Sequence, residues 1–430
     1  MLEGSPYQQY LYGYPHKTAY RALETPVPLE QVWSAEDTRA LFLYVHVPFC
    51  EMRCGFCNLF TAAGPTADGV SKYLDALERE ALAVKPVLGT AAFARAAIGG
   101  GTPSFLEPAQ LQRLFDLIER LGVPLGKTPL SIELSPETTT AQKVRVLRDR
   151  GAARVSIGIQ SFLEAEVAAV KRPQRRADVD RALDLLRAAD FQTLNLDFIY
   201  GIEGQTIDSF LQSLQVAQRW APEELYLYPL YVRPLTVLGK AARAWDDLRL
   251  SLYRAGRDWL KANGYRQLSM RMFRKGSAPA AAAPVYRCQE DGMLGLGVGA
   301  RSTTRGLHYS SEFAVGSRAV RGIIESYAAR PSASFTHAHH GFALSVSEQQ
   351  RRHAILSLLS EDGLDHAAFL ARFGVSSAVL PLKELVEHGL AREAGGALQL
   401  TDAGLERSDV IGPWLHSQAV DAAMQQWDQQ

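Results

Sequence analysis

Between residues 41 and 229, an apolar run, a loop with glycine or proline and an amphipathic segment follow one another repeatedly. Six apolar runs, several of them rich in β-branched residues, are expected strands, at 41–47, 95–98, 130–134, 154–159, 193–200 and 224–228. Apolar residues recur at helical spacing between them, which predicts helices over 70–82, 111–121, 139–150, 176–189 and 207–217. Strand–helix units in series, joined by right-handed crossovers, predict an α/β fold with a parallel sheet wound into a partial (β/α)6 barrel.

Three of the four cysteines of this 430-residue chain lie together in the loop after the first expected strand, as Cys50, Cys54 and Cys57. Thiolates this close together normally hold metal. A cubane iron–sulfur cluster usually takes four Cys ligands, so three ligands leave one iron open to a small molecule. Two alternatives stay open: a zinc site with His46 as the fourth ligand, and a redox Cys-x-x-Cys pair. Phe56 is either a packing residue or a ring that lies against an adenine base.

Glycines and polar residues follow the other expected strands, at the edge where ligands bind in parallel α/β sheets. Residues 99–103 form a glycine-rich turn in which the backbone can approach a ligand closely. Glu133 and Asp197 lie at or near the ends of buried strands, where a carboxylate needs a partner. Ribose hydroxyls would supply that partner, and a structural ion pair is the alternative. Gln160 and Arg172 are less telling, because the segment around Arg172 also fits a solvated turn.

The overall charge argues against several classes of partner. Lysine plus arginine and aspartate plus glutamate both number 46, so there is no basic excess of the kind that binds nucleic acid. No apolar run approaches the roughly 20 residues that cross a membrane, and the N-terminus lacks the pattern of a signal peptide. Clustered thiols suit a reducing compartment. We therefore expect a cytoplasmic protein that binds neither nucleic acid nor a membrane.

The pattern changes on both sides of the repeated units. We expect an N-terminal arm, a barrel core, a barrel extension with a linker, and a small C-terminal domain, over 1–40, 41–240, 241–344 and 345–430. The aromatic residues of the arm either pack on the core or wall a substrate site. The stretch 276–284 is expected to be a loop. Helices followed by two short apolar segments around Gly395-Gly396 predict a winged-helix-like C-terminal domain.

Three features of the extension are harder to assign. Residues 295–300 resemble a dinucleotide fingerprint only loosely and are expected to form a tight loop near the site. His337, His339 and His340 are expected in a surface loop, with metal ligation as the alternative. Cys288 is expected to be an ordinary thiol, in a loop that could reach the active site.

The segment from Tyr44 to Cys57, with its Cys-x3-Cys-x2-Cys motif, resembles the signature of radical S-adenosylmethionine enzymes. More narrowly, it is similar to the group typified by oxygen-independent coproporphyrinogen III oxidase, and the similarity runs over about 40–415. The resemblance implies a [4Fe–4S] cluster on Cys50, Cys54 and Cys57. It also implies one or two S-adenosylmethionine molecules, the first held by Tyr44, Gly100 and Glu133. The second would be held by Phe56, Gly101, Thr102, Gln160, Arg172 and Asp197.

The function implied by the resemblance is reductive cleavage of S-adenosylmethionine to a 5′-deoxyadenosyl radical, which abstracts hydrogen from a substrate. In porphyrin biosynthesis this gives oxidative decarboxylation. The family also contains methyltransferases and cyclopropanases that use a second S-adenosylmethionine, and haem chaperones. A monomer is expected, with a tetrapyrrole or a natural-product intermediate as substrate and flavodoxin or ferredoxin as electron donor. The chain departs from the coproporphyrinogen enzymes at Leu59, where they carry a further cysteine, and in its N-terminal segment.

Overall fold

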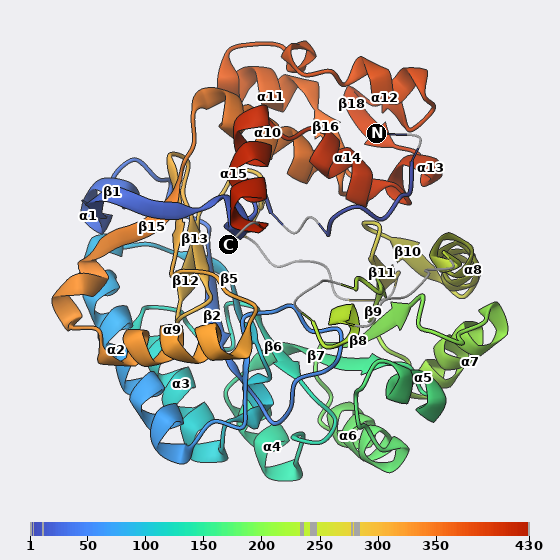
Figure 1. Ribbon diagram of the computed structural model, residues 1–430, viewed down its shortest axis with the longest axis horizontal. Helices are drawn as coiled ribbons and strands as arrows, with labels where there is room; N and C mark the ends of the chain where they lie inside the picture. The colour runs from blue at the N-terminus through green and yellow to red at the C-terminus, as the bar shows by residue number, and fades with distance from the viewer. Residues whose placement is uncertain are drawn as a thin grey trace.

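The computed structural model describes residues 2, 4–10, 13–232, 236–240, 247–276, 278 and 284–428. All six predicted strands are present, and each pairs in parallel with its predecessor in the chain. They are β2 (Leu41–Val47), β5 (Phe93–Gly100), β6 (Leu130–Leu134), β7 (Ala152–Gln160), β8 (Thr193–Tyr200) and β9 (Glu224–Pro229). This order confirms the partial barrel, whose strands and outer helices are seen in the lower half of Figure 1.

The five predicted helices cover the outside of the parallel strands (Figure 1). They are α2 (Ala67–Leu88), α3 (Pro108–Arg120), α4 (Ala141–Asp149), α6 (Arg176–Ala188) and α7 (Ile207–Ala217), with the short α5 (Glu164–Ala169) before α6. Each long helix buries one apolar stripe; in α3 this stripe consists of Leu111, Leu114, Phe115, Leu117 and Ile118. Burying a face of this kind against the sheet is the main stabilisation of such a layer.

The sheet extends well beyond the six units on both sides. The strand β12 (Met293–Leu296) pairs in parallel with β2, and β13 (Arg301–Thr303), β14 (Leu307–Ser310), β15 (His337–Ala343) and β1 (Arg21–Pro28) follow in antiparallel pairing. On the other side, β9 pairs with β11 (Met272–Lys275) and β11 with β10 (Tyr265–Gln267). Among the described residues the sheet has thirteen strands and runs from β1 to β10 without closing.

Two of the sequence-based expectations are wrong in this region. Residues 295 and 296 end a strand instead of forming a loop, although the tight turn does follow, over 297–300. His337, His339 and His340 lie in β15, between two other strands, and not in a surface loop. The expected loop at 276–284 cannot be assessed as a whole, because residues 277 and 279–283 lie outside the described part of the chain.

The remaining elements connect these layers. They are α1 (Leu29–Trp33), β3 (Phe49–Cys50), β4 (Ala62–Ala63), α8 (Arg249–Ala262), α9 (Ser317–Ala329) and the 3-10 turns η1 (Lys17–Ala19), η2 (Pro103–Phe105), η3 (Gln218–Trp220), η4 (Leu238–Lys240), η5 (Ser332–Thr336) and η6 (Ser377–Val379). The helices α2 and α9 lie near one another in the lower left of Figure 1. In the described part of the chain, no helix combines the length and the apolar character that a bilayer crossing requires.

The C-terminal part has its own hydrophobic core, built around side chains such as Ile355, Phe369 and Leu385. It contains α10 (Val346–Leu358), β16 (Leu364–Asp365), α11 (His366–Phe373), α12 (Lys383–Glu387), β17 (Ala391–Ala394), β18 (Ala397–Leu400), α13 (Asp402–Leu405), α14 (Ser408–Trp414) and α15 (Gln418–Asp428). The two predicted wing segments are the paired strands β17 and β18. Leu2, Tyr14 and Ala19 of the N-terminal arm pack into this same core. The boundaries of the four predicted parts stay predictions.

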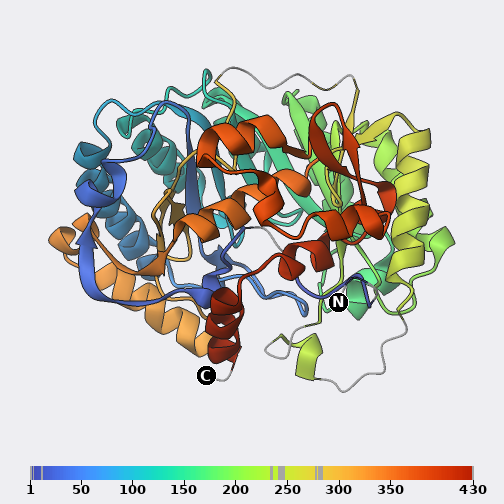
Figure 2. The same cartoon turned by 90° about the horizontal axis from the view of Figure 1, so that it is seen from above.

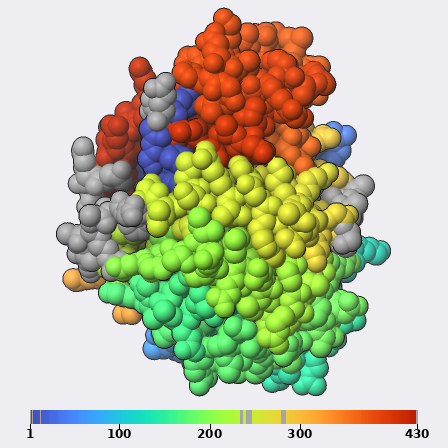
Figure 3. Space-filling model, turned by 90° about the vertical axis from the view of Figure 1, so that its right-hand side faces the viewer, coloured from blue at the N-terminus to red at the C-terminus, as the bar shows by residue number. Residues whose placement is uncertain are grey.

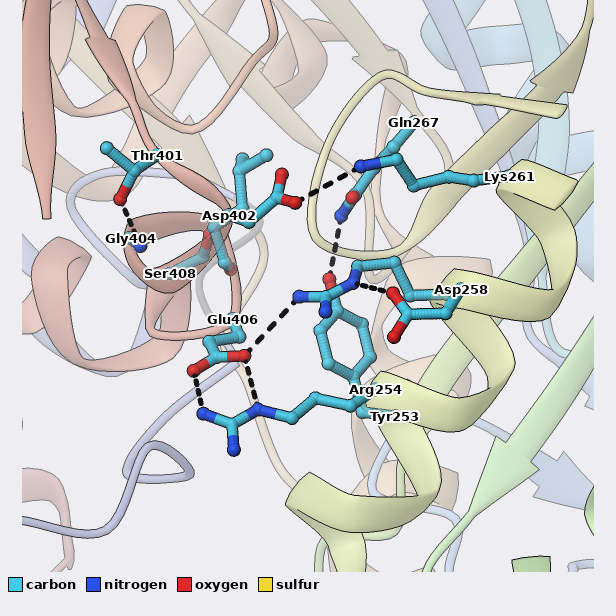
Figure 4. A network of polar contacts seen from close by, with 12 residues as sticks. Tyr253, Arg254, Asp258, Lys261, Gln267, Thr401, Asp402, Gly404, Glu406 and Ser408 are labelled. Carbon is cyan, nitrogen blue, oxygen red and sulfur yellow. Dashed lines mark hydrogen bonds and ion pairs between the residues drawn. The ribbon is translucent and has the colours of Figure 1, made fainter.

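Polar contacts join this C-terminal part to the barrel extension. In Figure 4, the guanidinium of Arg254 on α8 donates to both carboxylate oxygens of Glu406, and Lys261 pairs with Asp402 at 3.1 Å. Arg271 and Asp409 form a second ion pair, which is buried. Figure 2 shows the orange and red C-terminal helices lying across the sheet, and Figure 3 shows them packed on the yellow segment. The C-terminal part is therefore held against the barrel extension by ion pairs.

Candidate functional site

The cysteine loop and the glycine-rich turn meet at the carboxyl ends of β2 and β5. The amide of Gly101 donates to the carbonyl of Val47 at 2.7 Å, and the amide of Thr102 donates to that of Phe49 at 2.7 Å. The Thr102 hydroxyl also donates to Sγ of Cys50 at 3.5 Å. Gly101 is necessary here, because a Cβ at this position would lie 2.6 Å from the Phe49 carbonyl oxygen and 2.9 Å from Sγ of Cys50.

The middle of the cysteine loop is held by backbone contacts to two other segments. The amide of Gly55 donates to the carbonyl of Val170 at 3.1 Å, and its own carbonyl accepts from the amide of Leu238 at 2.9 Å. A Cβ at Gly55 would lie 2.8 Å from the Val170 oxygen. Next to Gly55, Phe56 packs against a small apolar cluster that contains Val170 and Leu238. The loop is thus fixed in shape by its neighbours.

The three thiols of the cysteine loop are the candidate metal ligands. Arg172 donates to Sγ of Cys54 at 3.2 Å, and burial raises the pKa of Cys50 to about 12. Bound metal would therefore replace a proton that this site otherwise retains. In the described ranges, no three His, Cys, Asp or Glu side chains approach closely enough to hold one metal ion together. Three thiols with no fourth protein donor would be the ligand set of an iron–sulfur cluster with one open iron.

His46 does not complete a zinc site, since both ring nitrogens have other partners. Its Nε2 lies 2.9 Å from the Phe60 carbonyl oxygen, and its Nδ1 lies 3.3 Å from the hydroxyl of Tyr44. Burial, together with the nearby charge of Lys17, lowers the pKa of His46 to about 3. The neutral ring therefore donates to Phe60 and accepts from Tyr44. It holds the hydroxyl of Tyr44, which lies in the middle of β2.

The glycine-rich turn packs against Glu133 and His46. The amide of Gly100 donates to the Glu133 carboxylate at 3.1 Å. Gly100 has a φ of +119°, and a Cβ there would lie 2.7 Å from the ring of His46. The Glu133 residue is exposed to solvent. Desolvation by the surrounding protein nevertheless raises the pKa of its carboxyl group to about 7. Glu133 has no ion-pair partner among the described residues, which leaves this carboxylate available to a ligand.

Asp197 lies in a polar network along β7 and β8. It accepts from the amide nitrogen of Asn195 at 2.8 Å and from the hydroxyl of Ser156 at 3.2 Å. Next to it, Arg154 pairs with Glu224 at 2.7 Å. The alternative of a structural ion pair therefore fits Glu224 better than Asp197. Sequence reasoning missed the residues around Asp197, although the alternation of polar residues at 154 and 156 and at 195 and 197 was a usable signal.

Gln160 and Arg172 join the same edge of the sheet. Gln160 has a φ of +66°, and a bulge interrupts the pairing of β7 with β8 between Gly158 and Gln160. Arg172 donates to the carbonyl of Gly158 at 3.0 Å while it also contacts Cys54. Arg172 is half-buried, so the alternative of a solvated turn is wrong for this side chain. Arg172 thus links the end of β7 to the cysteine loop.

The other candidates lie elsewhere. Tyr286 packs against Phe42 at the start of β2, and Cys288 is exposed in the loop that follows, away from the strand ends. The three β15 histidines line a cavity of about 820 Å³ next to α9, which none of the predicted cofactor-binding residues enters. His339 Nε2 lies 3.0 Å from the Ser334 carbonyl oxygen. Among the described residues, these histidines belong to no group of three potential metal ligands.

Comparison with known proteins gives concordant matches. The model of the radical SAM superfamily matches residues 44–217. The heme chaperone HemW of Bacillus subtilis (strain 168) is 27% identical over 387 residues, which cover 86% of this chain and 98% of the relative. The oxygen-independent coproporphyrinogen III oxidase of Escherichia coli (strain K12) is 27% identical over 388 residues, 84% of this chain and 82% of the relative. The solved structure of coproporphyrinogen III oxidase (HemN) from Escherichia coli superposes on this chain with a TM-score of 0.80 at 22% sequence identity. The match covers 94% of this chain and 96% of that chain, and it shows that the two folds are alike.

Proposed function

Since this chain belongs to the radical S-adenosylmethionine superfamily and to its HemN-like group, we propose that it cleaves S-adenosylmethionine and abstracts hydrogen from a small tetrapyrrole-like molecule. The observation that carries this proposal is the set of three thiols, Cys50, Cys54 and Cys57, beside Gly101. They share one loop at the carboxyl end of β2, and all three are free cysteines.

The cofactors supply the chemistry. The thiols of Cys50, Cys54 and Cys57 would hold a [4Fe–4S] cluster, which would supply reductive cleavage of S-adenosylmethionine with one electron from a donor such as flavodoxin or ferredoxin, and so the means to abstract a hydrogen atom from the substrate. The chain holds these groups in place and keeps water away from them. Arg172 would act on a bound cluster through its hydrogen bond to Sγ of Cys54, because a hydrogen bond to a ligand sulfur tunes the reduction potential of a cluster.

Tyr44, Gly100 and Glu133 would hold the first S-adenosylmethionine. Their support is mutual: Gly100 donates to Glu133, and His46 contacts both Tyr44 and the Gly100 position. Close backbone at Gly100 admits a ligand without a Cβ clash, and the accessible Glu133 carboxylate is an acceptor for an ammonium or a hydroxyl. A cation next to Glu133 would restore its ionised form, which desolvation disfavours.

A second candidate reaction is methyl transfer, which needs a second S-adenosylmethionine. Phe56, Gly101, Thr102, Gln160, Arg172 and Asp197 are the residues proposed to hold it. Asp197 favours this candidate, since it is an acidic acceptor separate from Glu133 and is held by Asn195 and Ser156 without an ion-pair partner of its own among the described residues. Oxidation, as in the coproporphyrinogen oxidases, stays the first candidate. In this chain the position of their additional cysteine is Leu59, whose side chain is 53% exposed.

The experiment that tests the enzyme proposal is anaerobic reconstitution of the full chain with iron and sulfide, followed by reduction and addition of S-adenosylmethionine. Mass spectrometry should detect 5′-deoxyadenosine from the wild type, and none from a chain with Cys50, Cys54 and Cys57 replaced by alanine. Cys288→Ala is the matched control, because this thiol is exposed and distant from the loop, and it should keep full iron content and activity. A wild type that loads iron but forms no 5′-deoxyadenosine would contradict the proposal.

Isotope labelling separates the two candidate reactions. With S-adenosylmethionine labelled in its methyl group, methyl transfer places the label in the product. With oxidation, the label stays in methionine, and deuterium from a labelled substrate enters 5′-deoxyadenosine. Binding of haem without turnover under any reductant would instead indicate a carrier, as the name of the HemW relative suggests for that protein.

A further inference from the structure

The cavity of about 820 Å³ lies between α9, α2 and the strands β12 to β15, and the proposed function leaves it unused. None of the residues proposed to hold the cluster or S-adenosylmethionine lines it. The wall formed by α9 is one stripe of the helix, because its residues recur at helical spacing: Ala319, Gly322, Ile323 and Ser326. Three of these four side chains are small, and nothing lies within 4 Å of a Cβ built at Gly322. The space under α9 is therefore open.

The carboxylate of Glu80, on α2, lines this cavity. Its Oε2 accepts from the hydroxyl of Tyr327 at 2.6 Å and from the amide of Gly297 at 2.7 Å. These two donors, one on α9 and one in the turn after β12, hold the carboxylate in a single orientation. In the described ranges no group donates to the other oxygen, Oε1. One acceptor of Glu80 is thus left for a ligand.

Glu80 also lacks a counter-charge. No ion pair joins it to a lysine, an arginine or a histidine within the described part of the chain. Arg330 lines the same cavity, but its guanidinium lies over the ring of Phe335, 5.4 Å from the ring centroid. Burial raises the pKa of Glu80, although its two hydrogen bonds and the charge of Arg330 oppose this shift. Because buried charges in proteins are normally paired, a cationic group at Oε1 would complete the site.

The other walls indicate what carries that cation. Apolar side chains face the cavity from three elements, and they are Val84, Leu294 and Ile323. The rings of Tyr327 and Phe335 join them, packed edge to face with centroids 5.5 Å apart. A volume of this size holds a small organic molecule, and aromatic faces attract a cationic group. A bare metal ion fits less well, since no three potential metal ligands gather among the described residues.

We propose that this cavity binds an organic ammonium, that is, an amine carried on an apolar or aromatic body. The ammonium donates to Oε1 of Glu80, and the body lies under the stripe of α9 that contains Gly322 and Ile323. The proposal does not rest on the proposed reaction, because the ligand is bound in addition to the molecules assigned to the barrel.

The cavity adjoins the cysteine loop through two of its walls. The hydroxyl of Ser317, at the start of α9, accepts from Arg53 of the cysteine loop at 2.9 Å. The turn that carries Gly297 also contains Gly299, where a Cβ would lie 2.9 Å from Nε2 of His46. A ligand under α9 therefore contacts elements that also support the candidate site, while it stays on the other side of them.

Binding of 2-(1-naphthyl)ethylammonium to the reconstituted full chain tests the proposal. Equilibrium dialysis near neutral pH compares it with 2-(1-naphthyl)ethanol, which has the same body without the charge. We expect the wild type to bind the ammonium at least tenfold more tightly than the alcohol, and Glu80→Gln to lose most of this preference. Glu325→Gln is the matched control, because Glu325 is exposed on α9 outside the cavity. Equal binding of the two probes by the wild type, or binding of neither, would overturn the proposal.

Two further variants locate the bound amine. Gly322→Trp fills the open space under α9 and should weaken binding of both probes at least tenfold, whereas Glu325→Trp on the same helix should not. Glu133→Gln removes the accessible carboxylate of the candidate site and should leave the preference for the ammonium unchanged. A preference lost in Glu133→Gln, or unweakened binding in Gly322→Trp, would place the amine elsewhere and overturn the proposal. These two variants decide the matter even if the melting temperature shows that Glu80→Gln does not fold. Formation of 5′-deoxyadenosine is not part of the readout, so failure of the enzyme proposal leaves this test unaffected.

Discussion

Arg172 donates a hydrogen bond to Sγ of Cys54 at 3.2 Å, and its other terminal nitrogen donates to the carbonyl of Gly158 at 3.0 Å. One side chain thus connects the cysteine loop to the bulge at the end of β7. A guanidinium at this distance stabilises the more negative, reduced state of a bound cluster. The same hydrogen bond also fixes the orientation of the Cys54 side chain.

Replacement of Arg172 should make the cluster harder to reduce. Arg172→Met removes a positive charge and a sulfur hydrogen bond, so we expect the midpoint potential in an electron paramagnetic resonance titration to become more negative, with iron content near that of the wild type. Lys171→Met is the control, because Lys171 is the exposed neighbour, and should leave the potential unchanged. A less negative potential in Arg172→Met would contradict the role assigned to this arginine.

Gly101→Ala should abolish cluster binding. The added Cβ would lie 2.6 Å from the Phe49 carbonyl oxygen and 2.9 Å from Sγ of Cys50, so that backbone or thiol must move. We expect iron per chain after reconstitution to fall at least tenfold, measured by a colorimetric iron assay. Gly306→Ala provides the comparison, since nothing lies within 4 Å of its Cβ position. Normal iron content in Gly101→Ala would contradict this prediction, because it would show that the loop accommodates the added Cβ.

His46 should make the fold sensitive to acid. In the folded chain its pKa is lowered to about 3, mainly by burial, while in the unfolded chain it is near 6.5. The unfolded state therefore binds the extra proton first, and stability that is complete above pH 6.5 is lost as the pH falls toward 3. Melting temperatures recorded across this range should fall less steeply for His46→Gln than for the wild type. His337→Gln, at an exposed position, should follow the wild type.

The buried Arg271–Asp409 pair should matter more than the exposed contacts around it. Asp409→Ala leaves a buried guanidinium without its partner, which typically costs about 3–5 kcal/mol. Asp402→Ala breaks only the exposed contact to Lys261 and should cost about 0–1 kcal/mol. Urea unfolding monitored by fluorescence compares the two variants. Equal losses would mean that Arg271 finds another acceptor, and the double variant Arg271→Met/Asp409→Leu tests this by recovering stability.

The parallel core could be predicted from the sequence because its signals are local. The strands β2, β5, β6, β7, β8 and β9 are rich in apolar residues. Tyr44, Gly100, Glu133, Gln160 and Asp197 lie in these strands, and the other cofactor candidates lie in the loops that follow them. The strand β1 was missed, since Arg21–Pro28 contains two prolines and leaves most of its residues exposed or half-exposed. The strand β15 was missed because its three histidines looked like a loop, although both of its neighbours in the sheet pair with it.

The charge environment of the site could not be predicted in the same way. Lys17 donates to the carbonyl of Gly299, and burial together with Arg301 lowers its pKa, although both residues are about 280 residues away in the chain. Arg172 looked like part of a solvated turn until Cys54 and Gly158 were brought next to it. Such contacts depend on tertiary structure, and no local pattern of residue types predicts them. Local reasoning therefore proposed the cofactor-binding residues, which stay predictions, and missed these tertiary contacts.

The packing of Tyr14 and Ala19 into the core of the C-terminal part has a consequence for synthesis of the protein. The arm leaves the ribosome before the barrel, but its packing partners leave last. Until then Lys17 has no fixed position, whereas the cysteine loop and its glycine turn already have all of their strand contacts. Cluster insertion can therefore precede docking of the arm, and the order of translation leaves a period in which iron and sulfide reach the loop before the arm is fixed beside it.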